Sequence, residues 1–318
     1  MTKTRGRYDV VIAGGGGAGL GAALMLGRAR RSVLVVDGGQ PRNAPAEHMH
    51  GFLSRDGMPP GELLEIGRRE VEGYDGEIVT GQVVSVAGAS GEFTVELDDG
   101  STVDARRLLV ATGLTDELPR IHGLAERWGR DVLHCPYCHG WEVRDQPIGV
   151  LATGPMAMHQ ALLFRQWSAD VTFLLHTAAK PADDELEQLT ALEIPVVPDE
   201  VTAVTVTDDR LSGVRLSSGM AIPLSALVIA PRFTARAGFL APLGLEPAPH
   251  PTGMGTYLAA DPDGRTSVPG VWAAGNVTDP RLQVLASAAA GATAAGAINA
   301  DLISEDVQNA LTERRNAL

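Results

Sequence analysis

The chain has 318 residues and a formal net charge of -13, with 44% hydrophobic and only 4% aromatic residues. This length suits two domains better than one, and the composition is that of a soluble globular protein. The acidic balance argues against nucleic acid or an anionic membrane surface as a partner, because both require a basic surface.

Cysteine usage restricts the chemistry further. The only two cysteines, Cys135 and Cys138, are three positions apart, whereas a secreted disulfide scaffold needs more cysteines at wider spacings. No second ligand cluster accompanies the pair, so we expect no metal. The apolar run over residues 10–26 is broken by Gly14–Gly17, which suits a turn better than a signal peptide, and no segment is long enough to span a membrane. We therefore expect a redox pair in a cytoplasmic protein.

The first half of the chain predicts a strand–helix–strand unit followed by a small sheet. An apolar strand at 8–13 leads into a glycine-rich turn, a helix that ends near residue 29, and a strand at 32–36 that ends at Asp37. Residues 38–60 are irregular. The other predicted elements of this half are a helix at 62–72, alternating strands of an antiparallel meander at 77–86, 91–97 and 102–104, and a buried strand at 107–111.

From about residue 117 the strand–helix–strand pattern starts again. A turn and strand at 146–152, a helix at 156–167 and a strand at 171–175 predict a second nucleotide-binding unit. The remaining predicted elements are a helix at 185–192, strands near 195–206, 211–216, 226–230 and 270–274, and an Ala-rich helix at 283–303. Because parallel α/β units bury their strands on both faces, we predict an α/β fold with two Rossmann-like dinucleotide-binding domains.

The first glycine turn has the spacing GxGxxG, filled by Gly14, Gly16 and Gly19. In this motif the first glycine permits the tight turn, the second lets the backbone approach a pyrophosphate, and the third lets the helix pack on the strand. The anion then lies at the helix N-terminus, where free N–H groups attract it. Asp37 is placed to accept the ribose hydroxyls. These features together predict an adenine dinucleotide; the alternative is a glycine-rich turn without a ligand.

The matching loop of the second unit has lost this pattern. Ala152 replaces the first glycine, and Pro155 removes a backbone donor where an anion would need one. No acidic residue closes the following strand, and Lys180 is the nearest cation to it. We therefore expect the fold of a nicotinamide-binding unit with an eroded NAD(P)H site.

The cysteine pair has the sequence Cys135-Pro136-Tyr137-Cys138 and is followed by His139. A CxxC at the start of a helix lowers the pKa of a thiol, and the thiolate is the nucleophile. His139 adjoins Cys138 and titrates near neutrality, so it can take or return the thiol proton. The alternatives are two buried reduced cysteines and a histidine that is an ordinary polar residue.

Together these motifs resemble the low-molecular-weight thioredoxin reductase family across nearly the whole chain. The segments that carry the resemblance are Gly14–Gly19, Gly38-Gly39-Gln40, Ala111-Thr112-Gly113, Cys135–Cys138 and Ala273-Ala274-Gly275-Asn276. The resemblance implies a split FAD domain over 1–115 and 242–318, an inserted NAD(P)H-like domain over 116–241 that carries the CxxC, and a homodimer. It also implies that Cys138 faces the flavin and that Cys135 exchanges with the substrate.

The FAD-binding residues that we expect lie in the glycine turns, the irregular segment after Asp37, and the start of the last helix. They are Gly14, Gly16, Gly17, Ala18, Gly19, Asp37, Gly38, Gln40, Arg42, Asn43, His50, Ala111, Thr112, Gly113, Gly275, Asn276, Gln283 and Val284.

Three features depart from the thioredoxin reductase pattern. The residues between the cysteines are Pro-Tyr instead of Ala-Thr, and His139 replaces an aspartate. The nicotinamide loop and its basic motif are missing, and Asn276 stands where aspartate is usual. The first two departures resemble a branch of the family, the dithiol oxidases that close the disulfides of gliotoxin, holomycin and related natural products.

We therefore expect an FAD-dependent dithiol oxidase that forms an intramolecular disulfide in a small-molecule dithiol, with O2 as the electron acceptor. One alternative is an NAD(P)H-dependent thioredoxin or disulfide reductase, in which electrons flow the other way. Another is a flavin-binding redox sensor without turnover. A CxxC beside a flavin forms a two-electron circuit, which favours an enzyme.

Overall fold

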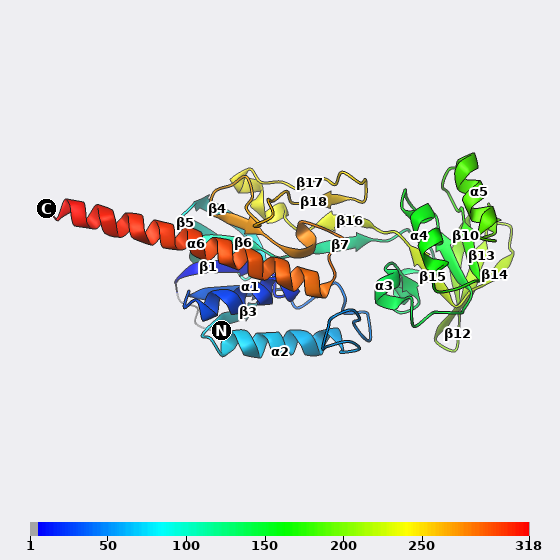
Figure 1. The fold of residues 1–318 in the computed structure, drawn as a ribbon, viewed down its shortest axis with the longest axis horizontal. Coiled ribbons are helices and arrows are strands. Elements are labelled where there is room, and N and C mark those ends of the chain that lie inside the picture. Colours follow the sequence, from blue (N-terminus) through cyan, green and yellow to red (C-terminus); the bar gives the residue numbers. More distant parts are fainter. Residues whose placement is uncertain (1–5, 318) are drawn as a thin grey trace.

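The structure, a computed structural model, describes residues 6–317, so residues 1–5 and 318 of the predicted FAD domain lie outside it. The chain forms two lobes joined by two paired antiparallel strands, β7 (Leu114–Glu117) and β16 (Arg232–Ala235) (Figure 1). The first lobe contains both ends of the described chain, and the second lobe is built from the segment between the two joining strands.

The first lobe is built on a seven-stranded sheet with the order β3-β2-β1-β6-β5-β4, in which β19 also pairs with β6. Its strands are β1 (Arg7–Ala13), β2 (Val33–Asp37), β3 (Glu77–Thr80), β4 (Val83–Ala89), β5 (Glu92–Leu97), β6 (Thr102–Val110) and β19 (Val271–Ala273). The pairs among β3, β2, β1, β6 and β19 are parallel, whereas β4, β5 and β6 form an antiparallel meander. The carboxyl ends of the parallel strands therefore meet at one edge, where α/β proteins place their ligands.

Several elements of this lobe differ from the prediction. The strands predicted at 102–104 and 107–111 form the single strand β6. Residues 77–86 divide into β3 and β4, and β3 pairs in parallel with β2. The prediction of an antiparallel strand is wrong for residues 77–80, because an alternating pattern does not specify the partner strand. The last helix, α6 (Val284–Asn316), extends past residue 303 because residues 304–316 contain no glycine or proline to end it. Its final turns project from the lobe (Figure 1).

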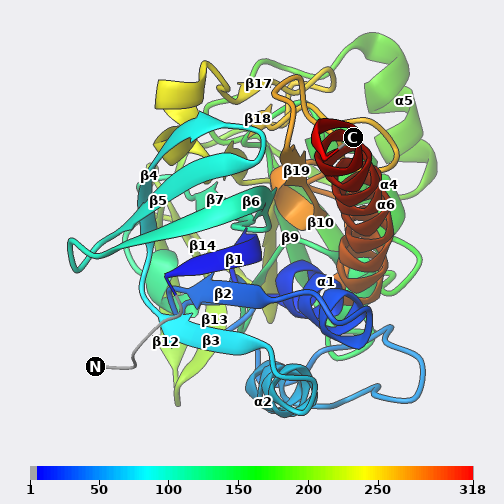
Figure 2. The same cartoon turned by 90° about the vertical axis from the view of Figure 1, so that its left-hand side faces the viewer.

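Both faces of the first sheet are buried, as expected for parallel strands. Side chains of β1 alternate between two cores, with Val11 in one and with Val10 and Ile12 in the other. Helices α1 (Gly17–Arg28) and α6 lie side by side over the second core (Figure 2), and α2 (Pro60–Glu72) packs beside α1. A Cβ on Gly291 would lie 1.9 Å from the Ala18 carbonyl oxygen, so a glycine is required where α6 crosses α1.

The second lobe contains a five-stranded parallel sheet with the order β11-β10-β9-β15-β8. Its elements are β8 (Val132–Leu133), α3 (Pro136–His139), β9 (Ile148–Leu151), α4 (Ala157–Phe164), β10 (Val171–Leu174), α5 (Asp183–Ala191), β11 (Val196–Val197) and β15 (Ala226–Ile229). A three-stranded antiparallel sheet, β12 (Val201–Thr207), β13 (Arg210–Leu216) and β14 (Ala221–Pro223), covers it; β14 was not predicted.

The remaining short elements connect or cap the lobes. They are η1 (Ala125–Arg127), η2 (Gly238–Leu243), β17 (Ala248–Pro249), β18 (Thr256–Tyr257) and η3 (Gly275–Val277). Ala237 and Leu240 pack in a core of the first lobe. The predicted α/β fold with two Rossmann-like units is confirmed, whereas the domain boundaries at 115/116 and 241/242 stay a prediction. Over residues 6–317, no helix has the length and hydropathy that crossing a bilayer requires.

Candidate active site

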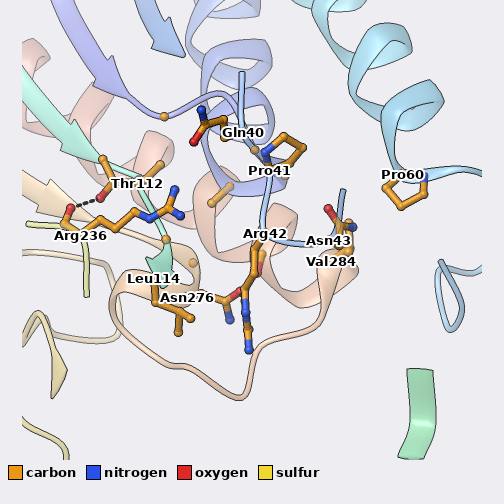
Figure 3. A pocket seen from close by; sticks show the side chains of 18 of the residues that line it. Gln40, Pro41, Arg42, Asn43, Pro60, Thr112, Leu114, Arg236, Asn276 and Val284 are labelled. Carbon is orange, nitrogen blue, oxygen red and sulfur yellow. Dashed lines mark hydrogen bonds between the residues drawn. The ribbon is translucent and has the colours of Figure 1, made fainter. Parts of the chain in front are cut away.

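A cavity of about 780 Å³ lies between the two lobes, at the carboxyl ends of the parallel strands of the first sheet. One part of its lining comes from the turns after β1, β2 and β6 and from the start of α6, and another part comes from the segment around α3. Figure 3 shows a part of this lining, with Gln40, Arg42, Asn43, Asn276 and Val284 drawn around the open space. The size and position suit a large bound cofactor.

The cavity brings together residues that are far apart in the sequence. Of the predicted site residues, those that line it are Gly14, Gly16, Gly17, Ala18, Asp37, Gly38, Gln40, Arg42, Asn43, His50, Ala111, Thr112, Gly113, Cys135, Cys138, His139, Gly275, Asn276, Gln283 and Val284. Gly19 is the exception, because it lies in α1 with its Cα against the Gly14 carbonyl group. Its position agrees with the packing role expected from the motif and not with contact to a ligand.

The glycine turn before α1 leaves room beside the helix N-terminus. Gly16 is the N-cap residue, and a Cβ placed on it would meet no protein atom within 4 Å. By contrast, a Cβ on Gly14 would lie 2.4 Å from the Ala111 carbonyl oxygen, and one on Gly19 would lie 1.8 Å from that of Gly14. The first turn of α1 has no acidic side chain, so its N–H groups can face an anion in this space.

Asp37 lies at the end of β2 and packs against the glycine turn. Its Oδ1 accepts a hydrogen bond of 3.2 Å from the Gly39 N–H, and its Oδ2 pairs with the Arg68 guanidinium. A Cβ on Gly15 would lie 2.7 Å from the Asp37 Cγ, so the turn and the carboxylate are in close contact. Arg68 belongs to α2 and was not predicted, because its partner lies 31 positions earlier in the chain.

Cys135 is the N-cap residue of α3, a single helical turn, and the N–H groups of Cys138 and His139 both donate to its carbonyl oxygen at 3.2 Å. The Gln283 Nε2 lies 4.0 Å from the Cys135 Sγ and 3.9 Å from the Cys138 Sγ, so one amide faces both sulfurs. Gln283 is the N-cap residue of α6, the last helix of the first lobe, and its side chain therefore connects that lobe to the dithiol of the second.

The two thiols are not equivalent. The Cys138 thiol donates a hydrogen bond to the Cys135 sulfur, and this bond lowers the pKa of Cys135 to about 7 against the effect of burial; nearby N–H groups and the Gln283 amide also lower it. The same bond, together with burial, raises the pKa of Cys138. Cys135 is therefore the thiol that ionises first and the better nucleophile at neutral pH.

His139 lines the cavity next to the dithiol and is half-buried. Burial lowers its pKa, a nearby His50 lowers it further, and Glu142 opposes the shift. Its imidazole is therefore neutral at pH 7 and can accept a proton.

His134 and Asp116 also line the cavity and were not predicted as site residues. The His134 Nδ1 lies 3.1 Å from the Ile229 carbonyl oxygen and 3.3 Å from the Gln160 Nε2. Burial lowers the pKa of His134. Adjacency to Cys135 was a signal for His134, whereas Asp116 had none, because its partner Arg42 is 74 positions away.

The family follows from comparison with known sequences. A family model described as pyridine nucleotide-disulphide oxidoreductase matches residues 8–295. The chain belongs to this family. Thioredoxin reductase sirT of Leptosphaeria maculans is 32% identical over 317 residues, which cover 94% of this chain and 96% of that protein.

Two solved structures are similar to this pyridine nucleotide-disulphide oxidoreductase over nearly its whole length. HlmI is 49% identical with a TM-score of 0.93, and the match covers 99% of this chain and 98% of HlmI. An oxidoreductase from Agrobacterium tumefaciens is 39% identical with a TM-score of 0.88, and the match covers 93% of this chain and 99% of that protein. The predicted resemblance to the thioredoxin reductases is thus confirmed.

The protein is therefore an oxidoreductase of the thioredoxin reductase-like type, and FAD is its cofactor. The geometry fits this cofactor, because the open space beside Gly16 can take a pyrophosphate at the N-terminus of α1. The dithiol lines the same cavity. The assignment of individual residues to FAD stays a prediction.

In the second Rossmann-like unit of this oxidoreductase, side chains just after β9 and β10 form hydrogen bonds within the protein. Residues 152–157 do not line the cavity, and the Thr153 Oγ1 donates to the Ala230 carbonyl oxygen at 2.9 Å. His176 stands just beyond β10, where nucleotide-binding units carry an acidic residue, and its Nδ1 accepts the Val201 N–H at 3.1 Å. Both side chains are thus engaged within the protein.

Proposed function

We propose that the protein is an FAD-dependent dithiol oxidase that closes a disulfide in a small-molecule dithiol and passes the electrons to O2. The observation that carries this proposal is the position of Cys135, Cys138 and His139 on the wall of one cavity. The same cavity includes the open space beside Gly16 at the N-terminus of α1. The resemblance of the Cys-Pro-Tyr-Cys-His-Gly segment to the natural-product dithiol oxidases supports it, as does the eroded second nucleotide loop.

The reaction begins with the oxidised Cys135–Cys138 pair. A substrate thiolate attacks the Cys135 Sγ, the Cys135–Cys138 disulfide breaks, and Cys138 leaves as a thiolate. The neutral His139 imidazole accepts the proton that the substrate thiol loses. The product of this step is a mixed disulfide between the substrate and Cys135.

The second substrate thiol then passes its proton to the Cys138 thiolate, whose raised pKa favours this, and attacks the substrate sulfur of the mixed disulfide. Cys135 leaves as a thiolate, which its low pKa favours, and the substrate departs as an intramolecular disulfide. When bound, FAD supplies the two-electron step that restores the Cys135–Cys138 disulfide and passes the electrons to O2, which leaves as hydrogen peroxide. The net reaction converts a dithiol and O2 into a disulfide and hydrogen peroxide.

The working unit that we propose is a homodimer in the cytoplasm. The family resemblance supports the dimer, and the presence of only one cysteine pair, in a motif typical of redox chemistry, supports a reducing compartment.

The deciding experiment is anaerobic reduction of the purified holoenzyme, followed by its visible flavin absorbance. A dithiol such as dithiothreitol is expected to bleach the flavin, whereas NADPH is not, and Cys135→Ser is expected to abolish bleaching by the dithiol. Rapid bleaching by NADPH would support the reductase instead. If NADPH does not bleach the flavin and no dithiol of a small panel supports oxygen uptake, the redox sensor is favoured instead.

A further inference from the structure

The long connection between β2 and α2, residues 38–59, reaches from the first lobe to the second; we refer to it as the clasp loop. Its Pro45 packs against Gly129, where an added Cβ would lie 2.8 Å from the Pro45 Cβ. Its His50 places Nε2 3.4 Å from the Glu142 Oε1, four residues after Cys138. The clasp loop therefore contacts the segments on both sides of the dithiol.

Arg42 of the clasp loop makes the most extensive of these contacts. Its Nε and Nη2 donate to the two carboxylate oxygens of Asp116 at 2.8 and 2.7 Å, and its Nη1 lies 3.4 Å from the Asn276 Oδ1. The guanidinium also lies over the Phe233 ring, 5.0 Å from its centroid. Figure 3 shows Arg42 beside Asn276 in the wall of the cavity.

These contacts join both strands that connect the lobes. Asp116 belongs to β7 and Phe233 to β16, and the two residues are direct partners in the β7–β16 ladder. The Asp116 side chain is only 7% exposed, so loss of Arg42 would leave a buried carboxylate without its counter-charge. The planar guanidinium is suited to this place, because it can bind a carboxylate with two hydrogen bonds and stack on an aromatic ring at the same time.

The contacts of Arg42 continue to the dithiol itself. Phe233 packs edge-on against the His134 ring, with centroids 5.3 Å apart, and His134 immediately precedes Cys135. Arg42 thus acts on the position of Cys135 through two packed rings. Its positive charge also opposes the rise in the pKa of Cys138 that the Cys135 hydrogen bond and burial cause.

We propose that Arg42 is a positioning residue that fixes the two connecting strands and thereby holds the Cys135–Cys138 pair against the FAD cavity. The sequence predicted Arg42 only as an FAD-binding residue. This inference rests on the proposed function for its catalytic consequence, but the clamping of the connecting strands does not depend on it.

Two measurements on the holoenzyme test the proposal with Arg42→Met, Arg42→Lys and the control Arg55→Met, an exposed arginine of the same loop. Arg42→Met is expected to speed amide hydrogen exchange in β7 and β16 about tenfold or more, because a buried ion pair is lost, and to leave β1 and β10 unchanged. Arg42→Lys keeps the charge but not the two-bond geometry, so exchange in β7 and β16 is expected to be slower than in Arg42→Met and faster than in the wild type. Arg55→Met is expected to match the wild type.

The second measurement is oxygen uptake with dithiothreitol. Arg42→Met is expected to lower kcat about tenfold while KM changes less than about threefold, because positioning acts on the step after binding. If Arg42→Met does not fold, Asp116→Asn removes the same ion pair at nearly constant side-chain volume and is expected to loosen the same two strands.

Unchanged exchange in β7 and β16 would overturn the proposal, whether or not kcat falls, because Arg42 would then not clamp the strands. Loosened strands with an unchanged kcat would also overturn it, because the clamp would then not position the dithiol. If the wild type itself oxidises no dithiol, the proposed function fails, and the exchange measurement alone decides whether Arg42 is a clamp.

Discussion

Gly16→Ala separates the cofactor-binding role of the glycine turn from its packing role. At Gly16 the backbone angles are φ -79° and ψ -170°, which an L-residue adopts without strain, and the added methyl group would meet no protein atom within 4 Å. At Gly19 the same methyl group would lie 1.8 Å from the Gly14 carbonyl oxygen. Both substitutions add one methyl group, but Gly16 is the N-cap residue and Gly19 lies within α1, and the added group meets open space at one site and backbone at the other.

The structure gives an expected magnitude for each substitution. Gly16→Ala gains about 0.4–1 kcal/mol from the unfolded state and loses a similar amount at the N-cap, so the stability of the apoprotein changes by less than about 1 kcal/mol. If a pyrophosphate occupies the open space, the methyl group costs about 1–3 kcal/mol of overpacking, which corresponds to a roughly 5- to 150-fold weaker affinity for FAD. Gly19→Ala forces the backbone apart and costs about 3 kcal/mol of folding stability.

The assay combines thermal unfolding of the apoprotein with calorimetric titration by FAD. Gly16→Ala is expected to unfold at nearly the wild-type temperature and to bind FAD much more weakly, whereas Gly19→Ala is expected to unfold several degrees lower. An apoprotein of Gly16→Ala that binds FAD with wild-type affinity would refute the reasoning, because no ligand atom could then lie against Gly16.

Three further predictions concern the dithiol and its neighbours. Gln283→Leu removes the amide that faces both sulfurs, so the pKa of Cys135 rises and its alkylation by iodoacetamide at pH 7 slows by about twofold or more; an unchanged rate would contradict the contact. His139→Ala is expected to lower kcat/KM for a dithiol at neutral pH by about a hundredfold or more, and full activity would show that His139 is not the base. Burial lowers the pKa of His134 and His139 in the folded protein. Below pH 6.5 the unfolded chain therefore binds more protons than the folded one. The free energy of unfolding is thus expected to fall as the pH drops from 6.5 toward the lower folded pKa values. Urea unfolding at pH 7, 6 and 5 measures this slope, and His134→Gln is expected to make it shallower; an equal slope would show that His134 does not contribute.

Much of the fold could be predicted because its signals are local. The GxGxxG turn between an apolar strand and a helix specifies its own geometry. Gly14 and Gly19 are needed because backbone atoms lie close to them, and Gly16 borders open space. The apolar runs of β1, β2 and β6 indicated strands buried on both faces, and the structure confirms them. The pairing of β3 was wrong, because alternation fixes which face is buried and not which strand lies beside it.

The candidate site divides in the same way. The residues of the glycine turn and of the CxxC could be named from short motifs, although their roles toward FAD stay predictions. The contacts that tune these residues could not be predicted, although Gln283 and Arg42 were named as expected FAD-binding residues. The Gln283 amide lies 145 positions from Cys138, and the Asp116 carboxylate lies 74 positions from Arg42, so no periodic pattern relates them.

The sequence by itself determined two nucleotide-binding units, one intact glycine turn and one redox pair, because each depends on backbone conformation and spacing within about 30 residues. Only the tertiary structure decided that the pair faces the cavity of the first unit, since that depends on how β7 and β16 orient one lobe against the other. A strand ladder and a buried ion pair between distant residues set this orientation, and such contacts gain their energy only after the chain has folded.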